Sequence, residues 1–197
     1  MKFGVILLAA GGSTRMGDQH KLLLPWGVRS VVGQALAAAT QAPVQSVALV
    51  LGARAPEVLA SCSPLPSHVT AVVNDQWTSG MYGSILAGLR ILPADTDAFF
   101  VALGDMPLVS AAVYGALASA YRARPGHIYM PTHGGRRGHP VMLPISLAAA
   151  APPETTDVGL RHVIQQNASL VVEVPVDNAG VCIDLDTPEQ YNAHAPS

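Results

Sequence analysis

Short, nearly uninterrupted apolar runs that alternate with amphipathic stretches restrict the fold of this chain more than any other feature. Runs of Val, Ile, Leu, Ala and Phe are typical of strands that are covered on both faces. The stretches between them keep apolar residues at helical spacing, as Met81, Ile85 and Leu89 do. This alternation predicts an α/β fold of three layers, in which helices cover both faces of a mostly parallel sheet. The expected strands are Phe3–Leu8, Val44–Leu51, Val69–Val73, Ala98–Leu103, His127–Met130 and Leu170–Val174.

The composition of the chain excludes several classes of protein. Of the 197 residues, 50% are hydrophobic and only 12% are charged, which is unlike a disordered chain. The 11 Lys and Arg residues stand against 13 Asp and Glu residues, so the formal net charge of -2 provides no broad basic face for nucleic acid. No apolar run approaches the roughly 20 residues of a membrane-spanning helix. We therefore expect a single domain over residues 1–197 that binds neither nucleic acid nor a membrane.

The cellular compartment is indicated by the cysteines and by the first residues of the chain. Cys62 and Cys182 are far apart in the sequence and form no cluster with the spacing of metal ligands. The apolar run at the start is short and is followed by glycines and charges, unlike a secretory signal. We expect a cytoplasmic protein with two buried, reduced thiols.

A glycine-rich loop with two cations follows the first expected strand. Residues 8–17 read Leu-Ala-Ala-Gly-Gly-Ser-Thr-Arg-Met-Gly, and Lys21 lies just beyond them. Small residues let a backbone approach a ligand, and exposed N–H groups bind anions. Arg15 and Lys21 supply the positive charge that a triphosphate needs. This combination favours a phosphate-binding loop over the alternative, a glycine turn with solvated basic residues.

Two common nucleotide motifs are absent from this loop. Gly12 and Gly17 have the gap of a P-loop, but Asp18 and Gln19 stand where Lys and Ser or Thr are required. The G-x-G-x-x-G fingerprint of dinucleotide-binding folds is also missing. These differences argue against a kinase-type ATPase and against an ordinary NAD enzyme.

Acidic residues occur at two further points that suit a metal. Asp105 ends the expected strand Ala98–Leu103, where a carboxylate is well placed to hold Mg²⁺; its alternative role is to cap the helix beginning near Ser110. Asp184 and Asp186 fall on one face of an extended segment. Thr187-Pro188-Glu189 is typical of a helix start, with Thr187 or Asp186 at the N-cap and Pro188 in the first turn. We expect Asp184 to be the second metal ligand and Asp186 to cap the last helix.

These motifs together resemble those of the MobA-like nucleotidyltransferases, and within that family they most resemble the molybdenum cofactor cytidylyltransferases. The resemblance rests on LAAGGSTRMG with Lys21, on the G-D-x-P element at residues 104–107 and on D-x-D-T-P-E at residues 184–189. It extends from residue 4 to about residue 191. Three residues separate Gly17 from Lys21, where many relatives have two. The resemblance implies a Rossmann-like fold of the nucleotide-diphospho-sugar transferase type.

The resemblance also implies which residues form the site. Gly80 and Ser84 match a G-M-x-x-S element that lines the nucleotide pocket in the family; read alone, they suit a capped helix. Lys21, Arg15 and Asp105 are implied to be catalytic, and Asp105 and Asp184 to hold the metal. The implied nucleotide-binding residues are Leu8, Ala9, Ala10, Gly11, Gly12, Ser13, Arg15, Lys21, Gly80, Ser84 and Asp105.

An acceptor site is implied by two further elements. The R-G-H-P element, with Arg137 and His139, lies in a basic loop that leads into another strand and borders the acceptor site in relatives. His139 either orients substrate or packs. The segment Thr156-Asp157-Val158-Gly159-Leu160-Arg161 is similar to a G-D-x-G-x-R element with Thr156 replacing the glycine, and Arg161 is expected to reach an anionic acceptor.

The implied reaction is Mg²⁺-dependent transfer of CMP from CTP to the phosphate of molybdopterin or molybdenum cofactor, with release of pyrophosphate. CTP is preferred because Leu-Ala-Ala-Gly resembles the cytidylyl-transferring members, and the methyl group of Ala10 narrows the pocket floor. One methyl group discriminates by only about 1–3 kcal/mol. A molybdenum-containing dehydrogenase apoprotein is a possible partner.

Several alternatives remain open. The acceptor could be another phosphorylated small molecule, and the donor could be GTP, as in guanylyltransferases. A non-catalytic protein that delivers molybdenum cofactor would bind without turnover. An oxidoreductase ranks last because the sequence carries no redox-cofactor motif.

Overall fold

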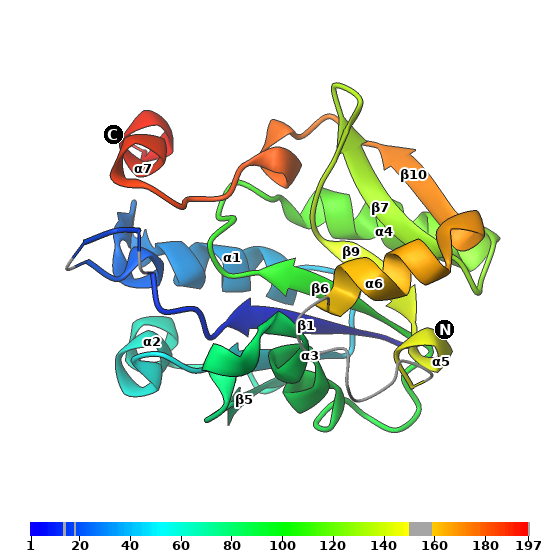
Figure 1. Ribbon diagram of the computed structural model, residues 1–197, viewed down its shortest axis with the longest axis horizontal. Coiled ribbons are helices and arrows are strands. Elements are labelled where there is room, and N and C mark those ends of the chain that lie inside the picture. Colours follow the sequence, from blue (N-terminus) through cyan, green and yellow to red (C-terminus); the bar gives the residue numbers. More distant parts are fainter. Residues whose placement is uncertain (14, 18, 150–158, 197) are drawn as a thin grey trace.

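A mixed sheet of eight strands forms the centre of the computed structural model, which describes residues 1–13, 15–17, 19–149 and 159–196 (Figure 1). Seven strands follow the order β10-β7-β9-β6-β1-β4-β5, and β8 pairs with β7. Neighbouring strands run parallel except at β9, which is antiparallel to β6 and β7, and at β8. The strands are β1 Phe3–Ala9, β4 Ser46–Leu51, β5 Val69–Val73, β6 Ala98–Leu103, β7 Ile128–His133, β8 Arg136–Arg137, β9 Val141–Pro144 and β10 Val171–Pro175.

Helices cover both faces of this sheet. Alternate residues of β1 serve the two cores: Val5 and Leu7 pack against α1, α2 and α4, whereas Ile6 packs against α3, α5 and α6. These helices are α1 Val31–Thr40, α2 Ala55–Cys62, α3 Met81–Leu89, α4 Ala111–Ala123, α5 Ile145–Ala149 and α6 Gly159–Gln166. The predicted three-layer α/β/α fold with a mostly parallel sheet is confirmed.

A small third core lies at the end of the molecule where the first loop and the C-terminus meet. The hairpin of β2 Pro25–Trp26 and β3 Arg29–Ser30 lies beside the last helix, α7 Pro188–His194 (Figure 1). The buried residues of this core are Met16, Leu24, Trp26, Val31 and Leu185. It joins segments from opposite ends of the chain.

The expected strands are all present, with ends displaced by at most three residues. The strand expected after the basic loop is β9, and its antiparallel direction joins β6 to the edge of the sheet formed by β7 and β10. The two thiols are free as expected, but Cys62 and Cys182 are half-buried, so their predicted full burial is wrong. Among the helices that the structure describes, none is long and apolar enough to cross a membrane.

The sheet brings distant segments together because β1 and β6 are parallel neighbours. Their carboxyl ends lie at the same edge, so the glycine-rich loop and Asp105 leave the sheet side by side. Gly104 N donates to the carbonyl oxygen of Leu8 at 2.9 Å, and a Cβ at Gly104 would lie 3.0 Å from that oxygen. Leu185 N donates to the carbonyl oxygen of Asp105 at 3.0 Å. The segment before α7 is thereby held against the end of β6.

Candidate active site

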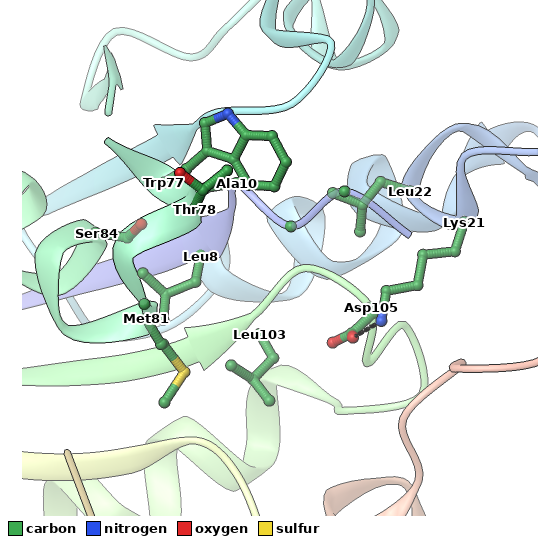
Figure 2. A pocket seen from close by; sticks show the side chains of 13 residues that line it. Leu8, Ala10, Lys21, Leu22, Trp77, Thr78, Met81, Ser84, Leu103 and Asp105 are labelled. Carbon is green, nitrogen blue, oxygen red and sulfur yellow. Dashed lines mark hydrogen bonds and ion pairs between the residues drawn. The ribbon is translucent and has the colours of Figure 1, made fainter. Parts of the chain in front are cut away.

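A cavity of about 420 Å³ opens where β1 and β6 end (Figure 2). Ser13 and Arg15 line a second cavity of about 190 Å³, which shares Gly11 and Lys21 with the first. Ala9 is buried in the sheet. Apart from Ala9, the predicted loop residues therefore lie around two adjoining cavities. The predicted residues that line the larger cavity are Leu8, Ala10, Gly11, Gly12, Lys21, Gly80, Ser84 and Asp105.

The loop after β1 is shaped by local hydrogen bonds and by a buried side chain. Ser13 has φ +55°, and its carbonyl oxygen accepts from Met16 N at 3.0 Å. The Ser13 hydroxyl oxygen accepts from Lys21 N at 3.1 Å. Met16 is buried in the third core. These contacts turn the loop back on itself and direct Lys21 toward the carboxylates, while Thr14 and Asp18 lie outside the described residues.

Lys21 lies at the centre of an ionic cluster. Its Nζ donates to Asp105 and, at 2.7 Å, to Asp186 (Figure 2 shows the contact with Asp105). The three side chains are only 13%, 17% and 16% exposed, so water screens these contacts weakly. Burial by itself lowers the pKa of Lys21, but the charges and hydrogen bonds of Asp105 and Asp186 outweigh it and leave that pKa above its ordinary value. The ammonium group is firmly protonated.

Arg15 contributes the second cation of the cluster. Its Nη2 lies 2.7 Å from Oδ2 of Asp186, and its side chain is 66% exposed at the mouth of the smaller cavity. Burial raises the pKa of Asp186, but the hydrogen bond and charge of Lys21, with the charge of Arg15, hold it below its ordinary value. An exposed guanidinium beside a buried ammonium is suited to a ligand with several negative charges.

The two C-terminal aspartates have different surroundings. Burial raises the pKa of Asp184, and the nearby charges of Asp186 and Asp105 add to this rise. Asp186 does not cap the last helix as predicted: the Thr187 hydroxyl accepts from Gln190 N, and the Gln190 side chain accepts from Thr187 N. The carboxylate of Asp186 is left free to pair with Lys21 and Arg15. That assignment was wrong because Thr187 takes the capping position.

The cluster offers oxygen ligands of the kind that Mg²⁺ prefers. Lys21 Nζ contacts both Asp105 and Asp186, and burial and the charges of these two carboxylates raise the pKa of Asp184, so three carboxyl groups lie near one another here. In the described part of the chain no set of three or more His, Cys, Asp or Glu residues has the geometry of a complete metal site. Two carboxylates completed by phosphate oxygens therefore fit these residues better than a cage made by the protein alone.

The predicted acceptor residues lie outside both cavities. Arg137 is exposed, and its Nε pairs with Glu173 Oε1 at 2.7 Å. Arg161 is exposed on α6. His139 Nδ1 lies 3.5 Å from the carbonyl oxygen of Val101, and burial lowers the pKa of this ring although Asp105 and Asp184 oppose that effect. His139 lines neither cavity, and Asp157 lies outside the described residues.

Sequence reasoning missed two residues at the inner end of the larger cavity. The Trp77 side chain forms part of its wall, next to Ala10 and Thr78 (Figure 2). Asn74 directly follows β5 and lies behind this end of the cavity, where it hydrogen-bonds the lining residue Ser84, which is only 3% exposed. An aromatic residue in a short loop before a glycine was the available signal for Trp77. The contacts of Asn74 with Gln76 and Trp77 are those of an ordinary turn, and its contact with Ser84 lies ten positions away, so no local pattern marks Asn74 as part of the site.

A glycine-rich cationic loop beside a carboxylate cluster, at the ends of parallel strands, defines an enzyme of the nucleotidyltransferase class. Residues 5–171 match the MobA-like NTP transferase domain, and the chain belongs to that family.

Three known proteins illustrate what this chain is similar to. The chain is 34% identical to nicotine blue oxidoreductase of Paenarthrobacter nicotinovorans, over 94% of this chain and 92% of that protein. It is 35% identical to a molybdenum cofactor guanylyltransferase of Mesorhizobium japonicum, over 80% of this chain and 70% of that protein. The fold is similar to that of a nucleotidyl transferase from Methanothermobacter thermautotroptrophicus, with a TM-score of 0.84, 22% identity and coverage of 98% and 95% of the two chains.

Proposed function

We propose that this protein transfers a nucleotidyl group from a nucleoside triphosphate to a phosphate of an acceptor, with CTP as donor and molybdopterin or molybdenum cofactor as acceptor. The observation that carries the proposal is the double ion pair of Lys21 with Asp105 and Asp186 beneath the glycine-rich loop. This arrangement places cations and carboxylates around the position that a polyphosphate would take.

The chemistry requires alignment and charge neutralisation. An oxygen of the acceptor phosphate forms a bond to the α-phosphorus while the bond from that phosphorus to the leaving pyrophosphate breaks. The attacking phosphate is already ionised, so no side chain has to remove a proton. Lys21 and Arg15 stabilise the charge that develops on the α-phosphoryl group and on pyrophosphate. Backbone N–H groups around Gly11 and Gly12 hold the phosphates in line.

A divalent ion, with Mg²⁺ as our choice, fits Asp105 and Asp184. It would supply charge neutralisation and hold phosphate oxygens in place. Lys21 pairs with Asp105 and Asp186, and its ammonium group would turn from Asp105 to a phosphate oxygen of the bound nucleotide, which frees that carboxylate for the ion. The three side chains thus serve one group of ligand oxygens.

The choice of base rests on the floor of the cavity. Ala10 lines the cavity, and its methyl group occupies space beneath a base that a glycine would leave open. This favours a pyrimidine and supports CTP. The name of the guanylyltransferase relative favours GTP instead. Pyrophosphate release with CTP, GTP and UTP separates the two donors.

A second candidate function is suggested by the name of the oxidoreductase relative, which aligns with 94% of this chain. Its test is turnover of nicotine blue in the presence of an added electron donor or acceptor, measured by absorbance. Turnover of nicotine blue without any release of pyrophosphate from a nucleoside triphosphate would favour this second function.

The proposed function is tested by Asp105→Asn in an assay of pyrophosphate release with Mg²⁺ and molybdopterin. We expect the rate to fall by about 100-fold, because a carboxylate that would hold the divalent ion on the phosphates is lost. Asp95→Asn is the matched control, since Asp95 pairs with Lys2 on an exposed surface. Turnover by Asp105→Asn at the rate of the unmodified protein would refute the assignment.

A further inference from the structure

Asn74 uses four polar groups to hold the segment between β5 and α3. Its backbone N donates to the carbonyl oxygen of Leu51 at 2.8 Å, and its own carbonyl oxygen accepts from Trp77 N at 3.2 Å. Its side-chain oxygen accepts from Gln76 N at 3.1 Å, and its side-chain nitrogen donates to Ser84 Oγ at 3.0 Å. Asn74 therefore connects the end of β4 with the backbone of Trp77 and the side chain of Ser84, two residues at the inner end of the cavity.

The direction of the hydrogen bond between Asn74 and Ser84 is determined by its surroundings. A backbone N–H can only donate, so the atom of Asn74 that faces Gln76 N must be the oxygen. The atom that faces Ser84 must then be the amide nitrogen, which can only donate. Ser84 Oγ is an acceptor in this contact, and its own hydrogen remains available to another acceptor. Ser84 lines the cavity and is 3% exposed, so that acceptor would be a group of the ligand.

The Trp77 ring is held across the glycine-rich loop by close packing. A Cβ at Gly12 would lie 2.9 Å from Cη2 of Trp77, and a Cβ at Gly52 would lie 2.8 Å from Cβ of Trp77. Trp77 and Ser84 lie at one end of the cavity, whereas Lys21 and Asp105 lie at the other (Figure 2). With the phosphates at the charged end, the base faces an aromatic wall and a hydroxyl donor.

We propose that Asn74 is a positioning residue for base recognition, which fixes the Ser84 hydroxyl as a hydrogen-bond donor to an acceptor atom of the nucleobase, such as a pyrimidine carbonyl oxygen. The inference rests on the proposed binding of a nucleoside triphosphate in this cavity. It assigns to Asn74 a role that acts through Ser84 and involves no contact with the reacting phosphates.

The test compares Asn74→Asp with Asn74→Ala. Asn74→Asp keeps the size of the side chain and the acceptor for Gln76 N. A carboxylate cannot donate, so the Ser84 hydroxyl turns to donate to it and its hydrogen is lost to the ligand. We expect the dissociation constant for CTP to rise by about tenfold in Asn74→Asp. In Asn74→Ala the hydroxyl hydrogen stays available, and we expect a rise of less than about threefold together with a lower melting temperature. A purely structural role predicts the opposite order.

The measurement is titration calorimetry of CTP and GTP with Mg²⁺ present, on variants whose circular dichroism matches that of the unmodified protein. Ser84→Ala separates the loss of the donor from repulsion by a new carboxylate. We expect it to weaken binding by about tenfold, and adding Asn74→Asp to it should weaken binding little further. Ser84→Ala carries the test alone if Asn74→Asp does not fold. Asn167→Asp is the matched control, because Asn167 bonds only the backbone of α6 through its side chain.

Each outcome decides between the two proposals. Unmodified protein that binds neither nucleotide overturns the proposed function, and this inference with it. Unmodified protein that binds, with Asn74→Asp or Ser84→Ala within twofold of it, overturns this inference alone. Effects of Asn74→Asp and Ser84→Ala that multiply in the double variant also overturn it, since Asn74 would then act independently of Ser84.

Discussion

His20 is a buried imidazole directly before Lys21, and none of the described residues forms a hydrogen bond with either ring nitrogen. Burial lowers the pKa of His20, and the charge of Arg54 lowers it further. The nearby backbone of Gly11 raises this pKa by a smaller amount, although it forms no hydrogen bond with the ring. The folded protein therefore holds this ring neutral at a pH where the unfolded chain binds a proton.

The sign of the pH effect follows from this shift. Above the ordinary pKa of 6.5 the ring is neutral in both the folded and the unfolded chain, so the free energy of unfolding is not reduced by this group. As the pH falls below 6.5 the unfolded chain binds a proton that the folded protein does not, and the free energy of unfolding decreases. We expect the melting temperature to fall between pH 7.5 and pH 5, and we expect His20→Leu to reduce that fall, since an apolar side chain loses no hydrogen bond there. Thermal melts at both pH values measure the effect. The exposed residue His194 provides the control His194→Leu, and an unchanged fall in His20→Leu would contradict this explanation.

The element before the acidic segment is the 3-10 helix η4, Ala179–Cys182, and two glycines let it pack closely. A Cβ at Gly138 would overlap the carbonyl oxygen of Val181, and one at Gly180 would overlap that of Leu108. His139 N also donates to the carbonyl oxygen of Val181 at 2.9 Å. These backbone contacts determine where the chain emerges toward Asp184.

Gly138→Ala is predicted to displace η4 and the carboxylates that follow it. We expect a loss of about 2 kcal/mol in the free energy of unfolding and a matching loss of nucleotide affinity, because backbone atoms cannot yield as a side chain does. Urea denaturation and nucleotide titration measure both. Gly115→Ala in α4 is the control: nothing lies within 4 Å of its Cβ, and we expect a gain of up to about 1 kcal/mol. A fully stable Gly138→Ala would show that η4 is not held by this contact.

Local sequence was sufficient to predict the elements but not the partners of individual side chains. Burial on both faces makes strands such as β1 and β6 visible as apolar runs, and glycine or proline marks their ends. The two aspartates of the C-terminal segment share one face when extended, so periodicity could not tell which one meets Lys21. Packing against the first loop decides that, and the same holds for Trp77 against Gly12. The sequence likewise did not indicate the ion pair of Arg137, since its partner Glu173 lies on another strand.

At the scale of the whole molecule, the site is assembled from the two ends of the chain. Lys21 and Arg15 come from the N-terminal loop, whereas Asp184 and Asp186 precede the last helix. Helix α7 joins them: the Tyr191 hydroxyl donates to the carbonyl oxygen of Pro25 at 2.6 Å, and its ring centroid lies 6.2 Å from that of Trp26.

Loosening this contact is predicted to weaken ligand binding more than it weakens the sheet. We expect Tyr191→Ala to raise the dissociation constant for CTP by about tenfold or more and to lower the melting temperature modestly. The reason is that the N-terminal loop and the segment before α7, which together form the site, would become more mobile. Tyr191→Phe removes only the hydroxyl and should have a smaller effect. Calorimetry and thermal melts measure the two quantities. Unchanged affinity in Tyr191→Ala would show that the arms are held without α7.

The ammonium group between Asp105 and Asp186 has a consequence for the protein before any substrate arrives. Like charges gathered in a half-buried hollow repel one another, and Lys21 offsets this repulsion within the fold itself. The carboxylates are thus assembled during folding, so an incoming ligand does not have to draw them together. Lys21 competes with a divalent cation for the oxygens of these carboxylates. Its ammonium group leaves them most readily when the phosphates of a ligand can bind it instead. An empty molecule would therefore hold free magnesium weakly and a magnesium–nucleotide complex well.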